Sequence, residues 1–300
     1  MDMTQNKCCR HGASLRRRRR RRRKILRSII FSCSIIAAAV FVAVGSRMIT
    51  SGDGRTNKYD VEAGNNTYDN TVIENSKISE KNKIQNNQSM LDDIMNSTQY
   101  PKQLKDLALK NEEALEFVYD YPAEHVKEHT IDLTEEASMD SVPLFVQWDK
   151  RWGYEKYSGN FFAASGCGPT TLSMVVVYLT HNREASPIAV AKYSKEAGYS
   201  VDGSGSSWTL ISEGCRHYGV KAKTVALDES RMKAELDAGH PIVINVGPGD
   251  FTDTGHFMVI TGYDDEGFSI NDPNSIEKSG KRWLFKNISS QIRAVWSMYV

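Results

Sequence analysis

The chain has 300 residues, 40% of them hydrophobic, so it is long enough to bury at least one sizeable core. Its net charge of +1 averages two unlike parts, because residues 1–27 carry twelve basic side chains against one acidic, and residues 28–300 carry 26 against 36. Only two of the five cysteines, Cys167 and Cys215, follow residue 46, which excludes a disulfide framework.

An arginine-rich tail precedes an uncharged apolar run. Residues 28–46, SIIFSCSIIAAAVFVAVGS, nearly span a hydrocarbon core of about 30 Å at about 1.5 Å rise per residue. The pattern predicts a basic cytoplasmic tail (1–27) and a single-pass transmembrane signal anchor (28–46), with everything after Arg47 outside the cell membrane. A cleaved signal peptide is the alternative. Binding of nucleic acid by the arginine run is not expected, because attraction to anionic lipid explains the run beside a membrane segment.

Two segments separate this anchor from the compact domain. Residues 47–98 are polar and rich in asparagine, which predicts a flexible, disordered stalk. Within residues 99–139, apolar side chains follow helical spacing between Pro101 and Pro122, so a short helical segment is expected to pack on the following domain.

Residues 140–300 show helical patterns first and strand patterns second, which predicts an α+β fold. A short strand and turn is expected at VPLFVQWDKRWG, residues 142–153. The predicted helices follow Cys167 and lie near residues 187–197, 208–218 and 229–238, and the predicted strands lie at 241–246, 256–263, 267–273 and 294–300.

Cys167 stands in an unusual setting, Gly-Cys-Gly-Pro, directly before an apolar stripe at i, i+3, i+4, i+7 spacing (Leu172, Val175, Val176, Leu179). Pro169 suits the first turn of a helix and Gly168 its cap, so Cys167 is expected just ahead of a helix N-terminus. The partial positive charge there favours a thiolate. Gly166 and Gly168 leave room for a substrate carbonyl. This context favours a nucleophile over the alternative, a small buried side chain.

A cysteine nucleophile needs a base and a group that orients the base. Of the seven histidines, His256 opens the predicted strand FMVITGY. A hairpin centred near residue 265 brings Asp272, or Asn271, within a few residues of the same rung. Gln147 is the upstream candidate for donating a hydrogen bond to an oxyanion, with an ordinary surface glutamine as the alternative. Cys215 is expected to be buried and reduced.

Four motifs in order, VPLFVQWDKRWG, SGCGPTTLSMV, GHFMVITGYDDEG and INDPN, resemble the papain-like cysteine peptidases related to bacteriocin leader peptidases, the C39-like group. The resemblance covers roughly residues 140–300 and implies a papain-like fold, with Cys167 as nucleophile, His256 as base and Asp272 as orienting residue. It also suggests Gln147 as the oxyanion residue. Leader-processing members usually carry a glutamine close before the cysteine, where this chain has Phe161 and Phe162. The resemblance therefore implies peptidase chemistry without implying cleavage of a double-glycine leader.

The sequence thus predicts a membrane-anchored, extracellular cysteine peptidase acting on a peptide or protein substrate. A peptidoglycan amidase or endopeptidase with the same core, and a non-catalytic cell-surface binding module, are the alternatives. No zinc-protease, paired CxxC or phosphate-loop motif is found, so no metal or cofactor is expected.

Overall fold

The structure, a computed structural model, describes residues 67–300, with side chains from Ser79 onward. The predicted cytoplasmic tail (1–27), the signal anchor (28–46) and the first part of the stalk lie outside these residues. Within residues 67–300, no helix has the length and apolar character needed to cross a bilayer.

The second part of the predicted flexible stalk is helical: α2 runs over Thr67–Asn96, 30 residues. The prediction of disorder is wrong for these residues. The stretch contains neither glycine nor proline. Its last turns also carry Met90, Leu91 and Ile94, which pack into an apolar cluster with the following helices. Since isolated helices are marginal in water, this packing explains why the polar sequence is helical.

Short helices follow α2 and pack on the domain beyond them. They are α3 (Lys102–Lys110), the 3-10 turn η1 (Glu112–Ala114), α4 (Leu115–Tyr119), α5 (Tyr121–Glu124) and α6 (Thr134–Ala137). Leu104, Leu107, Leu115 and Val118 are buried at the predicted helical spacing. They share one cluster with Phe161 and Ala163, which come just before Cys167 in the chain. The segment therefore contacts the part of the domain that carries the cysteine.

The domain places its helices mostly before its strands, as predicted. The helices are α7 (Phe162–Ser165), α8 (Cys167–Thr180), α9 (Pro187–Glu196), α10 (Thr209–Ser212), η2 (Gly214–Tyr218), α11 (Glu229–Asp237), α12 (Ile276–Ser279), α13 (Phe285–Ile288) and η3 (Ser289–Gln291). The single helix predicted near 208–218 is divided into α10 and η2, because the backbone leaves helical geometry at Glu213 (φ −127°, ψ −46°).

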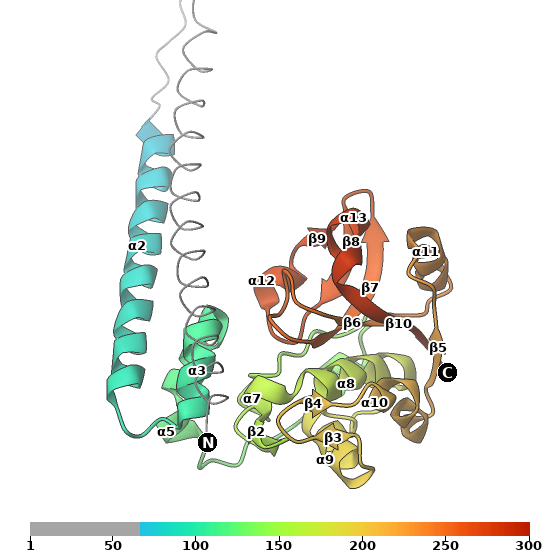
Figure 1. Ribbon diagram of the computed structural model, residues 1–300. Coiled ribbons are helices and arrows are strands. Elements are labelled where there is room, and N and C mark those ends of the chain that lie inside the picture. Colours follow the sequence, from blue (N-terminus) through green and yellow to red (C-terminus); the bar gives the residue numbers. More distant parts are fainter. Residues whose placement is uncertain (1–66) are drawn as a thin grey trace, which may run out of the picture. The chain divides into compact units, whose positions relative to one another are not determined.

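Six antiparallel strands form the main sheet, in the order β5-β10-β6-β7-β8-β9 (Figure 1). Their bounds are β5 (Lys221–Thr224), β6 (Ile242–Val246), β7 (His256–Asp264), β8 (Gly267–Asn271), β9 (Arg282–Trp283) and β10 (Ile292–Tyr299). Two small ribbons, β1 (Lys156–Tyr157) with β2 (Asn160–Phe161) and β3 (Ser200–Val201) with β4 (Gly205–Ser206), lie outside it. Strands β5 and β9 were not predicted.

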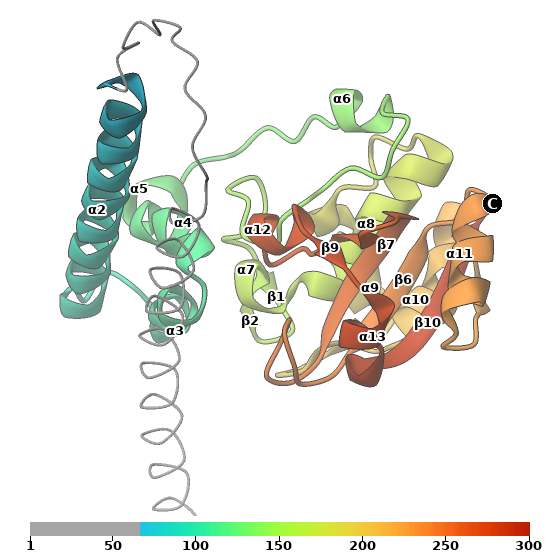
Figure 2. The same cartoon turned by 90° about the horizontal axis from the view of Figure 1, so that it is seen from above.

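Each face of the sheet is buried against helices (Figure 2). Val243, Phe257 and Trp296 point into a core shared with α8, α9 and α10. Their sequence neighbours Ile244 and Met258 point to the opposite face, where α11 and α13 cover them. Alternating side chains on strands explain why both faces are apolar. The site residues come from the start of α8 and from the end of the sheet where β7 begins and β8 stops.

Candidate active site

Cys167 is the first residue of α8, one residue earlier than predicted. Gly166 is the cap (φ −84°, ψ 8°) and Pro169 lies in the first turn. Leu172, Val175 and Val176 are fully buried, so the apolar stripe anchors the helix in the core. The cysteine itself is only half-buried. Cys167 therefore lies at a helix N-terminus and lines a cavity, the environment that favours a thiolate.

The two flanking glycines have a packing role that was not predicted. A Cβ on Gly166 would lie 2.6 Å from ring atoms of Phe162. A Cβ on Gly168 would lie 2.5 Å from Oγ of Ser206. Both glycines are thus required because other side chains approach the backbone closely on either side of the cysteine.

His256 and Asp272 form a buried ion pair. His256 is the first residue of β7 and pairs with Val246 of β6, while Asp272 directly follows β8. The predicted hairpin is present, since β7 and β8 are joined by a tight turn between Asp264 and Gly267. Nε2 of His256 lies 2.6 Å from Oδ1 of Asp272, and the two side chains are 7% and 1% exposed. Because a carboxylate only accepts hydrogen bonds, Nε2 carries the proton and Nδ1 is left for Cys167.

Asn271, the alternative partner of His256, serves another purpose. Its Nδ2 donates to the carbonyl oxygens of Val142 (3.1 Å) and Pro143 (3.0 Å). These bonds hold residues 142–143 next to the end of β8, and residues 142–146 form no strand, although a short strand was predicted there. The structure therefore places Asp272, and not Asn271, against the histidine.

The charges of the site favour a thiolate–imidazolium pair. Burial alone raises the pKa of the Cys167 thiol, but the hydrogen bond and charge of His256, with backbone hydrogen bonds from Phe257 and Gly168, bring this pKa below its ordinary value of 9.0. Burial alone lowers the pKa of His256, but the charge and hydrogen bond of Asp272, together with Cys167, raise it from 6.5 to about 10. The two shifts act in the same direction, because each favours the proton on the imidazole over the proton on the sulfur.

Gln147 is buried, at 4% exposed, which excludes the surface glutamine reading. Its Nε2 donates to the carbonyl oxygen of Ala163 (2.7 Å), and its backbone N–H donates to the carbonyl of Pro273 (2.7 Å). The side chain lines the same cavity as Cys167 and His256. An amide nitrogen carries two protons, and within residues 67–300 Nε2 of Gln147 donates only to Ala163, so its second N–H is available as a donor.

Two cavities meet at Cys167. One, of about 630 Å³, extends toward α3 and the loop of residues 249–255. The other, of about 660 Å³, extends over the glycine-rich loop 203–206 and Trp208. Cys167 thus lies where the two cavities meet, which is the geometry that an extended chain requires on both sides of a scissile bond.

Asn245 supports the histidine and was not predicted. It is 5% exposed within the apolar strand β6, and its Nδ2 donates to the carbonyl oxygen of His256 (3.2 Å). A polar residue inside PIVINV was the available signal, because a buried amide requires a partner. Among residues 67–300, no three His, Cys, Asp or Glu side chains gather in a way that could hold a metal ion.

The sequence profile of the Peptidase_C39 like family matches residues 139–300, more than half of the chain. The chain belongs to this family, and its domain has the family's fold of mixed helices and antiparallel sheet. Membership suggests a cysteine peptidase.

Two solved structures are each similar to about half of the chain. The peptidase domain of Streptococcus ComA, described as a bi-functional ABC transporter involved in a quorum sensing pathway, is 18% identical with a TM-score of 0.39, over 53% of this chain and 96% of that one. A putative C39-like peptidase from Bacillus anthracis is 17% identical with a TM-score of 0.34, over 53% and 95%. No curated protein matches the chain.

Proposed function

We propose that this protein is a papain-like cysteine peptidase that hydrolyses peptide bonds through Cys167, His256 and Asp272. The observation that carries the proposal is the arrangement itself: a half-exposed thiol at a helix N-terminus, next to a buried histidine that is held by a buried carboxylate. Nucleophile, base and orienting group are thus brought together from three elements of the fold.

In the first step, the Cys167 thiolate attacks the carbonyl carbon and a carbon–sulfur bond forms. The negative charge moves to the carbonyl oxygen, where the free N–H of Gln147 and the backbone N–H of Cys167 donate hydrogen bonds. As the tetrahedral intermediate collapses, the carbon–nitrogen bond breaks and Nδ1–H of His256 protonates the leaving amine.

In the second step, neutral His256 takes a proton from water, and the resulting hydroxide attacks the thioester carbonyl. The carbon–sulfur bond breaks, the acid is released, and the thiolate–imidazolium pair is restored. Asp272 holds the imidazole in one orientation throughout and stabilises its charged form.

The location is part of the same proposal. The basic tail 1–27 and the apolar run 28–46 support a signal anchor with the catalytic domain outside the cell membrane, because basic residues before an apolar segment favour a cytoplasmic N-terminus. Protease added to intact cells is expected to digest residues 67–300 and to leave the tail intact. Digestion only after the cells are lysed would contradict this topology.

The full chain is to be incubated with a peptide library, with purified cell wall and with a vinyl-sulfone probe. We expect peptide cleavage and probe attachment to Cys167, both lost in Cys167→Ala and retained in the control Cys215→Ala, whose thiol is buried away from the groove. Release of cell-wall fragments without peptide cleavage would instead assign the peptidoglycan hydrolase. An unreactive Cys167 would assign a binding module and contradict the proposal.

A further inference from the structure

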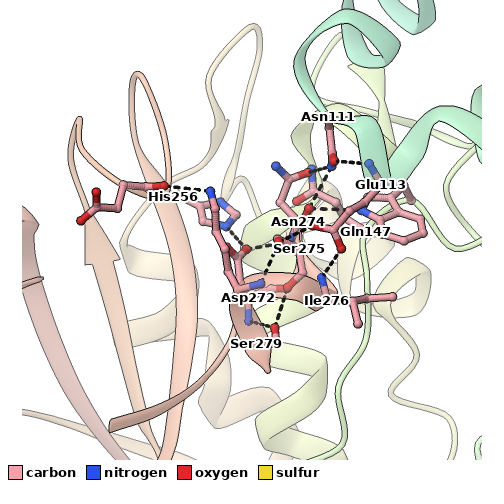
Figure 3. A network of polar contacts seen from close by, with 12 residues as sticks. Asn111, Glu113, Gln147, His256, Asp272, Asn274, Ser275, Ile276 and Ser279 are labelled. Atoms are coloured by element: carbon pink, nitrogen blue, oxygen red, sulfur yellow. Dashed lines mark hydrogen bonds and ion pairs between the residues drawn. The ribbon is translucent and has the colours of Figure 1, made fainter. Parts of the chain in front are cut away.

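A hydrogen-bonded connection joins the helical segment before the domain to the loop that carries Asp272 (Figure 3). We call residues 272–279 the aspartate loop; it includes α12. The Glu113 carboxylate accepts hydrogen bonds from the backbone N–H groups of Ile276 (2.7 Å) and Glu277 (3.0 Å) and from the hydroxyl of Ser275. One side chain of the preceding segment thus holds the start of α12, 162 to 164 residues further along the chain.

Asn111 makes a second connection to the same loop. Its Oδ1 accepts the backbone N–H of Glu113 (3.0 Å), which fixes η1. Its Nδ2 donates to the carbonyl oxygen (2.9 Å) and to Oδ1 (3.1 Å) of Asn274. Trp148 approaches that carbonyl from the domain itself, with Nε1 at 3.3 Å. Asn111 therefore uses both ends of its amide, one within its own segment and one on the aspartate loop.

The aspartate loop in turn determines where the Asp272 carboxylate lies. The backbone N–H of Asn274 donates to Oδ1 of Asp272 (2.8 Å), the same oxygen that faces His256. The backbone N–H of Asp272 donates to Oγ of Ser279 (2.9 Å), and that hydroxyl donates to the carbonyl of Ser275 (2.7 Å). Oδ2 of Asp272 has no hydrogen-bond partner among residues 67–300. Its orientation therefore depends on the loop conformation that Asn111 and Glu113 stabilise.

The segment also reaches the groove. Asp106, Leu107 and Lys110 of α3, together with Asn111, line the cavity at Cys167. The family profile begins at residue 139, so this wall and both connections come from outside the matched region. The apolar cluster that α3 and α4 share with Phe161 and Ala163 holds the segment in place independently of the polar contacts. Substitutions of Asn111 or Glu113 are thus expected to leave the fold intact.

We propose that Asn111 and Glu113 are positioning residues, which keep Asp272 against His256 and thereby set the reactivity of Cys167. This inference rests on the proposed function and extends the active site to a segment that precedes the family domain. Glu113 and Asn111 act through the loop and do not touch the reacting atoms.

The experiment measures the rate of Cys167 alkylation by iodoacetamide against pH in the full chain, resolved from the other cysteines by peptide mapping. Three variants are compared with wild type: Glu113→Ala, Glu113→Gln and Asn111→Asp. Glu113→Gln keeps one oxygen that accepts hydrogen bonds. Asn111→Asp keeps the contact with η1 and loses the N–H donor to Asn274. Glu116→Ala is the matched control, because Glu116 lies exposed on the neighbouring turn.

Displacement of Asp272 removes a charge that raises the pKa of His256. The imidazolium is then less stable, and the Cys167 thiolate loses part of the positive charge that stabilises it. We expect the apparent thiol pKa to rise by about one pH unit in Glu113→Ala and Asn111→Asp, so that alkylation at acid pH slows by about tenfold. Glu113→Gln is expected to lie between these variants and wild type, and Glu116→Ala to match wild type. On a cleaved peptide, kcat should fall about tenfold with KM little changed.

The proposal would be overturned if folded Glu113→Ala and Asn111→Asp had the same alkylation profile and kcat as wild type. If Glu113→Ala does not fold, the same comparison is made with Glu113→Gln and Asn111→Asp. The alkylation measurement needs no substrate. A chain that cuts no peptide but shows the expected shifts would contradict the proposed function and support the positioning role. An ordinary thiol profile in wild type would overturn both.

Discussion

The charge of Asp272 can be separated from its hydrogen bond by two substitutions. Asp272→Asn removes the charge but keeps an oxygen that accepts Nε2–H of His256, whereas Asp272→Ala removes both. The pKa of His256 is raised from 6.5 to about 10, with the Asp272 charge as the leading favourable cause. At about 1.4 kcal/mol per pH unit this rise stabilises the imidazolium by about 5 kcal/mol, shared between Asp272 and the thiolate.

The assay is the pH dependence of kcat/KM. The acid limb reports protonation of Cys167, below 9.0, and the alkaline limb reports loss of the His256 proton, near pH 10. Because His256 must be charged to protonate the leaving amine, activity falls above its pKa. Loss of an opposite charge at this range lowers such a pKa by about one to three pH units. In Asp272→Asn the alkaline limb is therefore expected to move down to about pH 7–9.

The maximum value of kcat/KM in each pH profile allows a second comparison between the two variants. Asp272→Asn is expected to keep activity at its new optimum within about tenfold of wild type, because the imidazole keeps its orientation. Asp272→Ala is expected to lose about 100-fold or more, since nothing then fixes the ring. An alkaline limb that stays near pH 10 in Asp272→Asn would refute the reasoning, because the charge would then have no part in raising the histidine pKa.

Four further outcomes follow from the site. Cys167→Ala and Cys167→Ser are expected to abolish hydrolysis while their circular dichroism spectra stay the same as that of wild type. Residual turnover above about 10⁻³ of the wild-type rate would contradict a nucleophilic role. Gln147→Ala is expected to lower kcat by about 10²–10³ with KM little changed, and an effect on KM alone would instead indicate substrate binding. Gly166→Ala is expected to destabilise the fold by about 1–3 kcal/mol through its clash with Phe162, and an unchanged melting temperature would exclude that clash. Cys215 is fully buried with its thiol pKa raised to about 11, so iodoacetamide is expected to label it only after unfolding; labelling as fast as Cys167 would contradict its burial.

Local signals were sufficient to predict the main parts of the site. The Gly-Cys-Gly-Pro stretch before an apolar stripe predicted a cysteine at a helix start, and α8 begins at Cys167. A single hairpin relates His256 to Asp272, so their proximity depended on a sequence separation of only 16 residues. Such short-range geometry can be obtained from strand periodicity and turn residues.

Long-range packing could not be predicted in this way. Nothing local in KNEEAL, residues 110–115, indicates that Glu113 meets α12, because the two are separated by more than 160 residues. The α2 helix was not predicted for a related reason. Its sequence is polar, and the packing of its last turns on α3 and α4, which stabilises the helix, is visible only in the folded structure. The packing role of Gly166 was not predicted, because only the folded structure places the Phe162 ring against it.

The central claim is that Cys167 becomes covalently acylated during turnover. The most direct test is to quench the full chain with acid while it hydrolyses a peptide and to map its peptides by mass spectrometry. The account predicts that the acyl part of the substrate is attached to the peptide containing Cys167, and that the adduct is absent from Cys167→Ala. Peptide hydrolysis by Cys167→Ala at the wild-type rate, with no adduct in either chain, would contradict the account.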